Sequence, residues 1–195
     1  AVGACFAGVA SKEIVATAPV LIWLYDRTFV AGSFGAAWRA RKGSYAALAA
    51  SWIPLGWLVV HNGQRGGTVG FGLGTSSWQY LLTQSDAITT YLKLSFWPDP
   101  LVVDYGVGLA KGVGDVWWQG LIVLALLVGT ALALWRRPAV GFLGAWFFII
   151  LAPSSSFLPL TTQTMAEHRM YLPLAAPILA VVLGLSGWLN RRTAW

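Results

Sequence analysis

The stretch WWQGLIVLALLVGTALALW, residues 117–135, decides the fold class, because it carries no charged residue over its whole length. A membrane-spanning helix needs about 20 mostly apolar residues. Residues 171–189 are nearly as apolar, although they contain Pro173 and Pro177. Both stretches therefore predict transmembrane helices.

Two further segments approach the same length and hydropathy. Residues 44–60 form one of them. Residues 139–152 are shorter, but they lie between Pro138 and Pro153. Proline is favoured at the first position of a helix, and a helix usually ends before the next proline. The sequence therefore predicts a helix in each segment.

The first 25 residues are apolar except for Lys12 and Glu13, and they allow two interpretations. One is a single long or kinked helix, residues 1–25, with an intramembrane charged pair. The other is a helix that ends near Ala10, with Lys12 and Glu13 at the interface. The thirteen residues after Lys12 would then span only about 20 Å, so we favour the first interpretation.

The composition supports a lipid environment. The chain is 57% hydrophobic and 10% charged, whereas soluble domains carry roughly 25% charged residues. We therefore predict an all-α polytopic membrane protein, a single domain of residues 1–195 cut from a longer chain. It would have about five transmembrane helices and one interfacial or re-entrant helix near residues 78–97.

The basic residues predict the orientation. Eight of the thirteen Lys and Arg residues lie in three short segments, residues 26–43, residues 136–138 and the C-terminus. Such clusters mark cytoplasmic loops, so the net charge of +6 does not indicate nucleic-acid binding. The predicted location is a multi-pass protein of the bacterial inner membrane, with extracytoplasmic loops at residues 61–116 and 153–170.

One polar cluster, Glu167-His168-Arg169, directly precedes the last predicted helix. Charges at that depth are costly unless they are paired or hydrated, which makes them functional candidates. An Arg offers a planar fork for phosphate, and a His can donate to phosphate or move a proton. The alternative is an interfacial ion pair that caps and anchors the helix.

The other polar candidates are weaker. Lys12 and Glu13 either fix helix packing or contribute to a phosphate or acceptor site. The glycine-rich run that contains His61 and Arg65 could wrap an anion, but it fits a surface loop better. Asp104 lies in a loop where no His or Cys completes a metal site.

Several strings together resemble the membrane portion of transmembrane-and-tetratricopeptide-repeat (TMTC-like) proteins, which are C-type (GT-C) membrane glycosyltransferases. The strings are Ser11-Lys12-Glu13 with Pro19 and Tyr25-Asp26, Tyr91-Leu92-Lys93-Leu94 leading to Trp97-Pro98 and Asp104-Tyr105, Pro153-Ser154-Ser155-Ser156-Phe157, and Ala166-Glu167-His168-Arg169-Met170-Tyr171-Leu172-Pro173. The last string is the most specific, and His168 lengthens its usual spacing by one residue.

The resemblance implies inverting transfer of a sugar from a polyprenyl-phosphate donor to a protein hydroxyl on the extracytoplasmic face. Arg169 is then the candidate for the donor phosphate, with His168 or Lys12 assisting. Glu167 and Glu13 are candidate orienting residues, and His61, Arg65 and Asp104 are candidate loop contacts.

The resemblance also implies parts that the chain does not contain. The family's acidic catalytic residues lie in a first extracytoplasmic loop, and its tetratricopeptide repeats follow the last helix. We therefore expect the general base upstream of this chain and an inactive fragment if the chain is isolated. Either an Arg or a divalent cation would stabilise the leaving phosphate.

Two other classes of function remain open. The chain could be a non-enzymatic subunit that packs in a larger membrane complex, because Trp- and Gly-rich helices pack closely against partners. It could also be a transporter fragment in which Lys12, Glu13 and Glu167 are coupling charges, although the paired broken segments of inverted repeats are missing.

Overall fold

The computed structural model describes residues 2–61, 76–102, 105–106, 108–155 and 164–193, and the side chains of residues 13, 58–61 and 191–193 lie outside that description. All regular secondary structure in the described residues is helical. The predicted all-α class is therefore correct.

Helices α1 to α4 make up the first part of the chain. They are α1 (Val2–Ser11), α2 (Ala18–Tyr25), α3 (Phe34–Ala49) and α4 (Trp52–His61). A 3-10 turn, Glu13–Thr17, joins α1 to α2, and a π-helical turn, Asp26–Val30, follows α2. Ser33 begins α3 as an N-cap, because its side chain accepts a hydrogen bond from Ala36 N.

Helices α5 to α8 make up the second part. They are α5 (Ser77–Phe96), α6 (Val113–Arg136), α7 (Pro138–Leu151) and α8 (Ala175–Thr193). A 3-10 turn, Glu167–Met170, precedes α8. Pro138 occupies the first turn of α7, where its missing N–H costs nothing.

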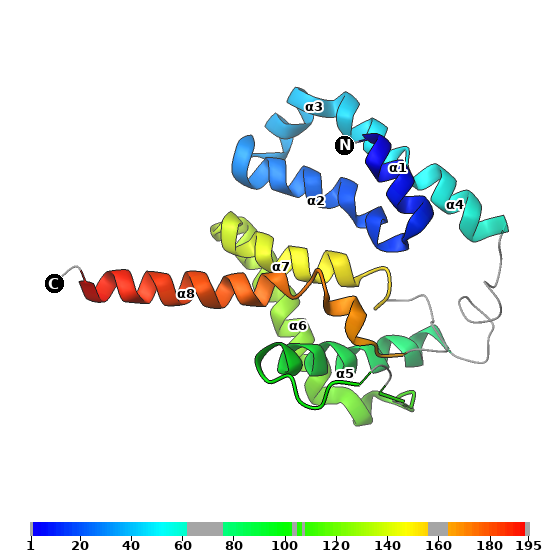
Figure 1. Ribbon diagram of the computed structural model, residues 1–195, viewed down its shortest axis with the longest axis vertical. Helices are drawn as coiled ribbons and strands as arrows, with labels where there is room; N and C mark the ends of the chain where they lie inside the picture. The colour runs from blue at the N-terminus through cyan, green and yellow to red at the C-terminus, as the bar shows by residue number, and fades with distance from the viewer. Residues whose placement is uncertain (1, 62–75, 103–104, 107, 156–163, 194–195) are drawn as a thin grey trace.

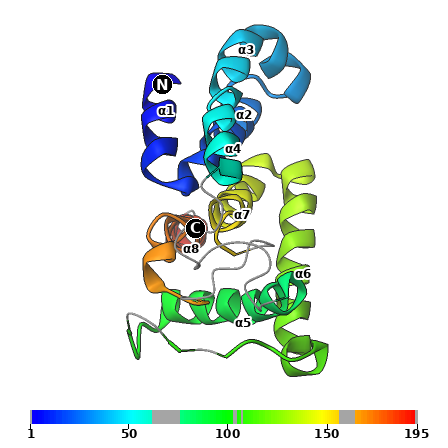
Figure 2. The ribbon, with the colours of Figure 1, turned by 90° about the vertical axis from the view of Figure 1, so that its right-hand side faces the viewer.

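The two parts form stacked groups that meet at α7. Figure 1 shows α1 to α4 above α7, and α5 below it. Helix α7 contacts α2 and both turns of the first group, and it also packs against α6 and α8. In Figure 2, α6 runs from the level of α7 past α5. In Figure 1, α8 extends away from the other helices.

The main hydrophobic cluster lies between α5, α7 and the turn before α8. Its buried members are Ala87, Ile88, Tyr91, Phe147, Leu151, Met165, Met170 and Ala176. This packing places the polar turn Glu167–Met170 against the end of α5, where the candidate site forms.

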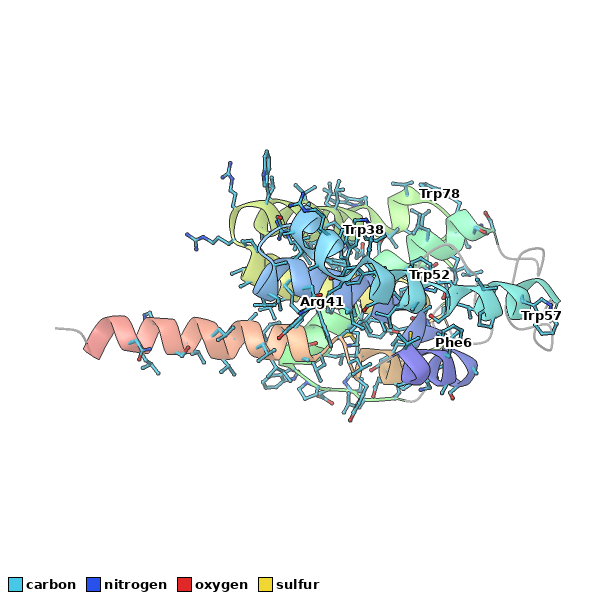
Figure 3. The ribbon with its side chains drawn as sticks, turned by 90° about the horizontal axis from the view of Figure 1, so that it is seen from above. Phe6, Trp38, Arg41, Trp52, Trp57 and Trp78 are labelled. Carbon is cyan, nitrogen blue, oxygen red and sulfur yellow. The ribbon has the colours of Figure 1, made fainter. Side chains whose placement is uncertain are left out.

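Exposed tryptophans lie on α3 and α4 of the first group of helices. Figure 3 shows Trp52 and Trp57 along α4, near Phe6 of α1, with Trp38 on α3. Between 43% and 58% of the surface of Trp38, Trp52 and Trp57 is exposed. Aromatic rings of this kind favour an interface between apolar and aqueous surroundings.

The prediction of about five transmembrane helices is wrong. Among the described residues, α6 is the one helix that is both long and apolar enough to cross a membrane, judged by length and composition. Helices α1, α7 and the apolar part of α8 have between 10 and 17 residues. A helix of 17 residues is about 26 Å long, less than the roughly 30 Å of a hydrocarbon core.

Chain breaks explain the difference. Lys12 has an extended backbone, with φ −148° and ψ 132°, so residues 1–25 form two short helices and a turn. Residues 50–51 separate α3 from α4 within the predicted helix 44–60. The stretch that starts at Tyr171 begins with a turn, and α8 starts only at Ala175.

The prediction of a multi-pass integral membrane protein is wrong for the same reason, since only one helix in the described part of the chain qualifies as a span. The predicted cytoplasmic loop at residues 26–43 contains the π-helical turn and much of α3. Residues 78–97, predicted as an interfacial or re-entrant segment, largely coincide with α5. This helix buries Tyr80, Gln84 and Tyr91 in the interior.

Candidate functional site

The turn Glu167–Met170 is anchored by a tyrosine of α5. Tyr91 Oη accepts a hydrogen bond from Ala166 N at 2.8 Å and donates to Ala166 O at 3.1 Å. Ala166 is fully buried and extended, with φ −147° and ψ 130°. Burial raises the pKa of Tyr91, so this hydroxyl keeps its proton and remains a donor at neutral pH.

Glu167 faces the loop that follows α5. Its Oε1 accepts one hydrogen bond from Val102 N at 2.6 Å and another from Tyr105 Oη at 2.6 Å. Tyr105 Oη also lies 3.0 Å from Pro100 O. Burial, followed by the hydrogen bond and negative charge of Glu167, raises the pKa of Tyr105 to about 12, so Tyr105 stays protonated and holds the carboxylate in place.

A cavity of about 420 Å³ opens beside this carboxylate, between α5, its following loop and the turn before α8. Glu167 and His168 both line it, and His168 is exposed. The apolar walls are formed by Leu94, Pro98, Leu101, Met170 and Leu174. The cavity thus combines polar groups from one turn with an otherwise apolar surface.

Arg169 has a different environment from its two neighbours. It is 8% exposed, and its Nη1 lies 3.3 Å from both Ser154 O and Thr164 O. Tyr80 Oη donates to the same Ser154 oxygen at 2.8 Å, and Gln84 Nε2 donates to the same Thr164 oxygen at 3.1 Å. Arg169 therefore helps α5 to hold the two segments on either side of residues 156–163.

The structure does not gather all the predicted site residues. Lys12 is exposed and lies at the break between α1 and the 3-10 turn. The described residues that line the Glu167 cavity all come from α5 and later segments. Lys12 is therefore not part of that lining.

The remaining predicted residues are only partly described. Glu13 begins the 3-10 turn and His61 ends α4, but the side chains of both lie outside the description. Arg65 and Asp104 fall outside the described residues. Within the described part of the chain, no three His, Cys, Asp or Glu residues lie close enough to hold a metal ion.

A second polar cluster was not predicted from the sequence. Asp26 is 6% exposed, and Arg41 Nη1 lies 2.5 Å from its Oδ1, with Tyr45 Oη 2.5 Å from its Oδ2. The Arg41 hydrogen bond, and then that of Tyr45, hold the pKa of Asp26 below its usual value. The available signal was that Asp26 is the one acid in the predicted basic segment 26–43.

Comparison of the chain with models of known protein families finds no match, and comparisons with curated proteins and with solved structures find no significant match.

Proposed function

We propose that this chain forms the donor side of a glycosyltransferase that moves a sugar from a polyprenyl-phosphate donor to a protein hydroxyl. The observation that carries the proposal is the cavity in which Glu167 and His168 stand at the edge of an apolar surface. A polyprenyl-phosphate sugar also has a polar part beside an apolar part, because its apolar chain is joined to a polar headgroup. The strings that resemble C-type membrane glycosyltransferases support the same class of donor.

The contacts suggest different roles for the three residues of the turn. His168 is exposed in the cavity, and an imidazole can donate a hydrogen bond to phosphate. Glu167 is held by Val102 and Tyr105, and it would bind hydroxyl groups of the sugar. Arg169 already donates to two backbone carbonyls, so we assign it as a positioning residue of the turn.

The proposed reaction breaks the bond between the sugar C1 and the phosphate oxygen and forms a bond between C1 and the acceptor oxygen. The acceptor proton passes to a carboxylate base. The bonding electrons leave with the polyprenyl phosphate, whose negative charge a cation stabilises. The part of this chain in the reaction is to bind and orient the donor.

The test is sugar transfer by the full-length protein, measured with a radiolabelled polyprenyl-phosphate sugar and an acceptor peptide. His168→Ala should raise the KM for the donor about tenfold with a smaller change in kcat, as expected for a lost binding contact. Lys12→Ala is the matched control, because Lys12 does not line the cavity. Wild-type transfer by His168→Ala, or an equal loss in Lys12→Ala, would show that the donor site is wrongly placed.

Variants of Arg169 distinguish a positioning role from direct contact with the phosphate. Arg169→Ala should lower both transfer and the melting temperature, because it removes buried hydrogen bonds to Ser154 and Thr164. Arg169→Lys should recover part of both. A variant that folds normally but transfers no sugar would indicate that Arg169 contacts the phosphate itself.

A second candidate function is that of a non-enzymatic subunit in a larger complex. It is favoured by the exposed apolar side chains of α8, which extends away from the other helices (Figure 1). They include Ile178, Leu179, Val182, Leu183, Leu185 and Leu189. Purification of the full-length protein with a stable partner, and without transfer activity, would favour this class.

A further inference from the structure

Helix α6 presents a continuous stripe of exposed apolar side chains along one side. Trp117 and Trp135 are 18 residues apart, which is about five whole turns, so they lie on the same side of the helix. Four exposed apolar residues between them point within about 80° of that direction, at 100° per residue. They are Leu121, Leu124, Val128 and Leu132, and each is between 48% and 57% exposed. These six residues form the α6 stripe.

The side of α6 opposite the stripe packs against the rest of the molecule. Gln119 is buried, and its Nε2 donates to Asp86 Oδ1 of α5 at 3.1 Å. Gly144 of α7 lies close to Thr130. In Figure 2, α6 lies along one edge of the molecule. The stripe therefore faces away from the helices that α6 contacts.

The length and the ends of the stripe match a lipid bilayer. The helix rises about 27 Å from Trp117 to Trp135, close to the roughly 30 Å of a hydrocarbon core. Tryptophan is enriched at both interfaces of a membrane, and these two side chains are 59% and 81% exposed. Helices that pack together in a membrane use small residues for close approach. The large side chains of the stripe therefore favour lipid over a second helix as the covering.

The two ends of the stripe differ in charge. Trp135 is followed by Arg136 and Arg137, and both are exposed. Near Trp117, the exposed Asp115 accepts a hydrogen bond from Lys111 N at 2.9 Å. That end thus carries one charge of each sign, whereas the Trp135 end carries two positive charges.

The π-helical turn Asp26–Val30 lies near the arginine end. The ring of Phe29 is 5.2 Å from the ring of Phe142, which follows Arg137 by five positions on α7. Asp26, the acid of this turn, is buried and held by Arg41 and Tyr45. The turn therefore adds an exposed aromatic side chain to this end, while its carboxylate is already paired.

We propose that the arginine end of the stripe binds anionic phospholipids, with the headgroup phosphate at Arg136 and Arg137 and an acyl chain along Leu132 and Val128. The planar fork of an arginine matches a phosphate, and basic side chains beside a membrane-spanning helix attract anionic lipids. A phosphatidylcholine has the same phosphate, but the two arginines repel its choline cation. It covers the Trp117 end equally well, where no excess positive charge selects between lipids.

The test is photolabelling of the full-length protein in vesicles of phosphatidylcholine with a minor share of phosphatidylglycerol. Two probes carry the same diazirine acyl chain, one on phosphatidylglycerol and one on phosphatidylcholine, and mass spectrometry maps the labelled peptides. The ratio of phosphatidylglycerol to phosphatidylcholine labelling should be at least about fivefold higher over residues 128–137 than over residues 113–121, the effect of one basic side chain near the headgroups. An excess of sn-glycerol 3-phosphate, which has the phosphate without the chains, should leave the ratio unchanged.

Three variants locate the contact. Replacing both arginines by glutamine, Arg136→Gln with Arg137→Gln, should lower the ratio at residues 128–137 to that of the other end. The melting temperature should not change, because both side chains are exposed. Arg136→Lys with Arg137→Lys keeps the charges and should retain most of the preference. Lys111→Gln is the control, since it removes a positive charge at the opposite end of α6.

Equal ratios at the two ends of wild-type α6, or an unchanged ratio in the double glutamine variant, would overturn the proposal. Suppression by sn-glycerol 3-phosphate would indicate a site for soluble phosphates instead. A stripe that neither probe labels, in a dimer that Leu132→Gln dissociates, would show that a second copy covers it. None of these results depends on sugar transfer, so this proposal and the proposed function fail independently.

Discussion

At the scale of single residues, Asp26 ties the π-helical turn to α3. Arg41 lies within α3 but has non-helical dihedral angles, with φ −139° and ψ 27°. This break lets the Arg41 side chain bind Asp26 together with Tyr45, one turn further along. A carboxylate that is 6% exposed requires such partners, because an unpaired buried charge is strongly destabilising.

Asp26→Asn should destabilise the protein by about 2 kcal/mol, because hydrogen bonds to charged groups contribute about 1.5–3 kcal/mol each. The value lies below the roughly 3–6 kcal/mol of two such bonds, since the Arg41 side chain is 51% exposed and water screens its charge. The measurement is chemical unfolding of the full-length protein in detergent. Asp99→Asn is the control, because Asp99 is exposed and should change stability by less than about 0.5 kcal/mol.

The difference in stability between wild type and Asp26→Asn should depend on pH. In the folded state the pKa of Asp26 is lowered from its ordinary value of 3.8. The stabilising contribution of the ionised side chain is therefore present above pH 3.8. The contribution is lost as the pH falls through the folded-state pKa. The difference between wild type and Asp26→Asn should therefore be constant at neutral pH and shrink below about pH 4. A difference that grows on acidification would contradict this account.

At the scale of elements, α6 and α7 are held together by a close backbone contact. A Cβ added at Gly141 of α7 would lie 2.2 Å from Leu134 N of α6. Backbone cannot move aside as a flexible side chain does, so only glycine allows this approach. The contact positions α7 between the two groups of helices.

Gly141→Ala should destabilise the protein by about 2–3 kcal/mol, because the two helices must separate to admit a methyl group. Gly129→Ala is the matched control on α6, where an added Cβ meets nothing within 4 Å. That substitution should stabilise the helix by up to about 1 kcal/mol, since glycine loses more conformational freedom on folding. Chemical unfolding measures both. Equal effects of the two variants would show that the contact is not tight.

The sequence predicted elements best where local signals were strong. The uncharged stretch 117–135 lies within α6, and Pro138 begins α7 as expected. Periodicity could not show that the chain becomes extended at Lys12, because the residues around it are apolar on both sides. Tertiary packing of α1 against α3, α4 and the following turn determines that break.

The candidate site was only partly predictable, for a related reason. Glu167 and His168 could be identified as a costly polar pair in an apolar chain. Their partners could not, because Val102 and Tyr105 lie more than 60 positions earlier in the sequence. The direction of Arg169 toward backbone carbonyls likewise depends on how α5 packs.

At the scale of the whole molecule, apolar surface remains exposed on α6 and α8. On α6 the exposed side chains include Leu121, Leu124, Leu126, Leu127, Val128 and Leu132. The composition indicated correctly that apolar side chains exceed what the interior holds. It did not show that α1, α7 and the apolar part of α8 are too short to cross a membrane.

Helix α6 should therefore insert into a membrane without the rest of the chain, and α7 should not. The helix that follows the non-helical Val116, residues 117–136, would be about 30 Å long and residues 138–151 about 21 Å, against roughly 30 Å of hydrocarbon. The measurement is a glycosylation-mapping insertion assay, with each segment placed in a host protein between two acceptor sites. Leu124→Arg, near the centre of α6, should reduce insertion, because an arginine there costs about 2.5–3.5 kcal/mol. Insertion of α7 as efficiently as α6, or no effect of the arginine, would mean that length and hydropathy do not distinguish the two helices.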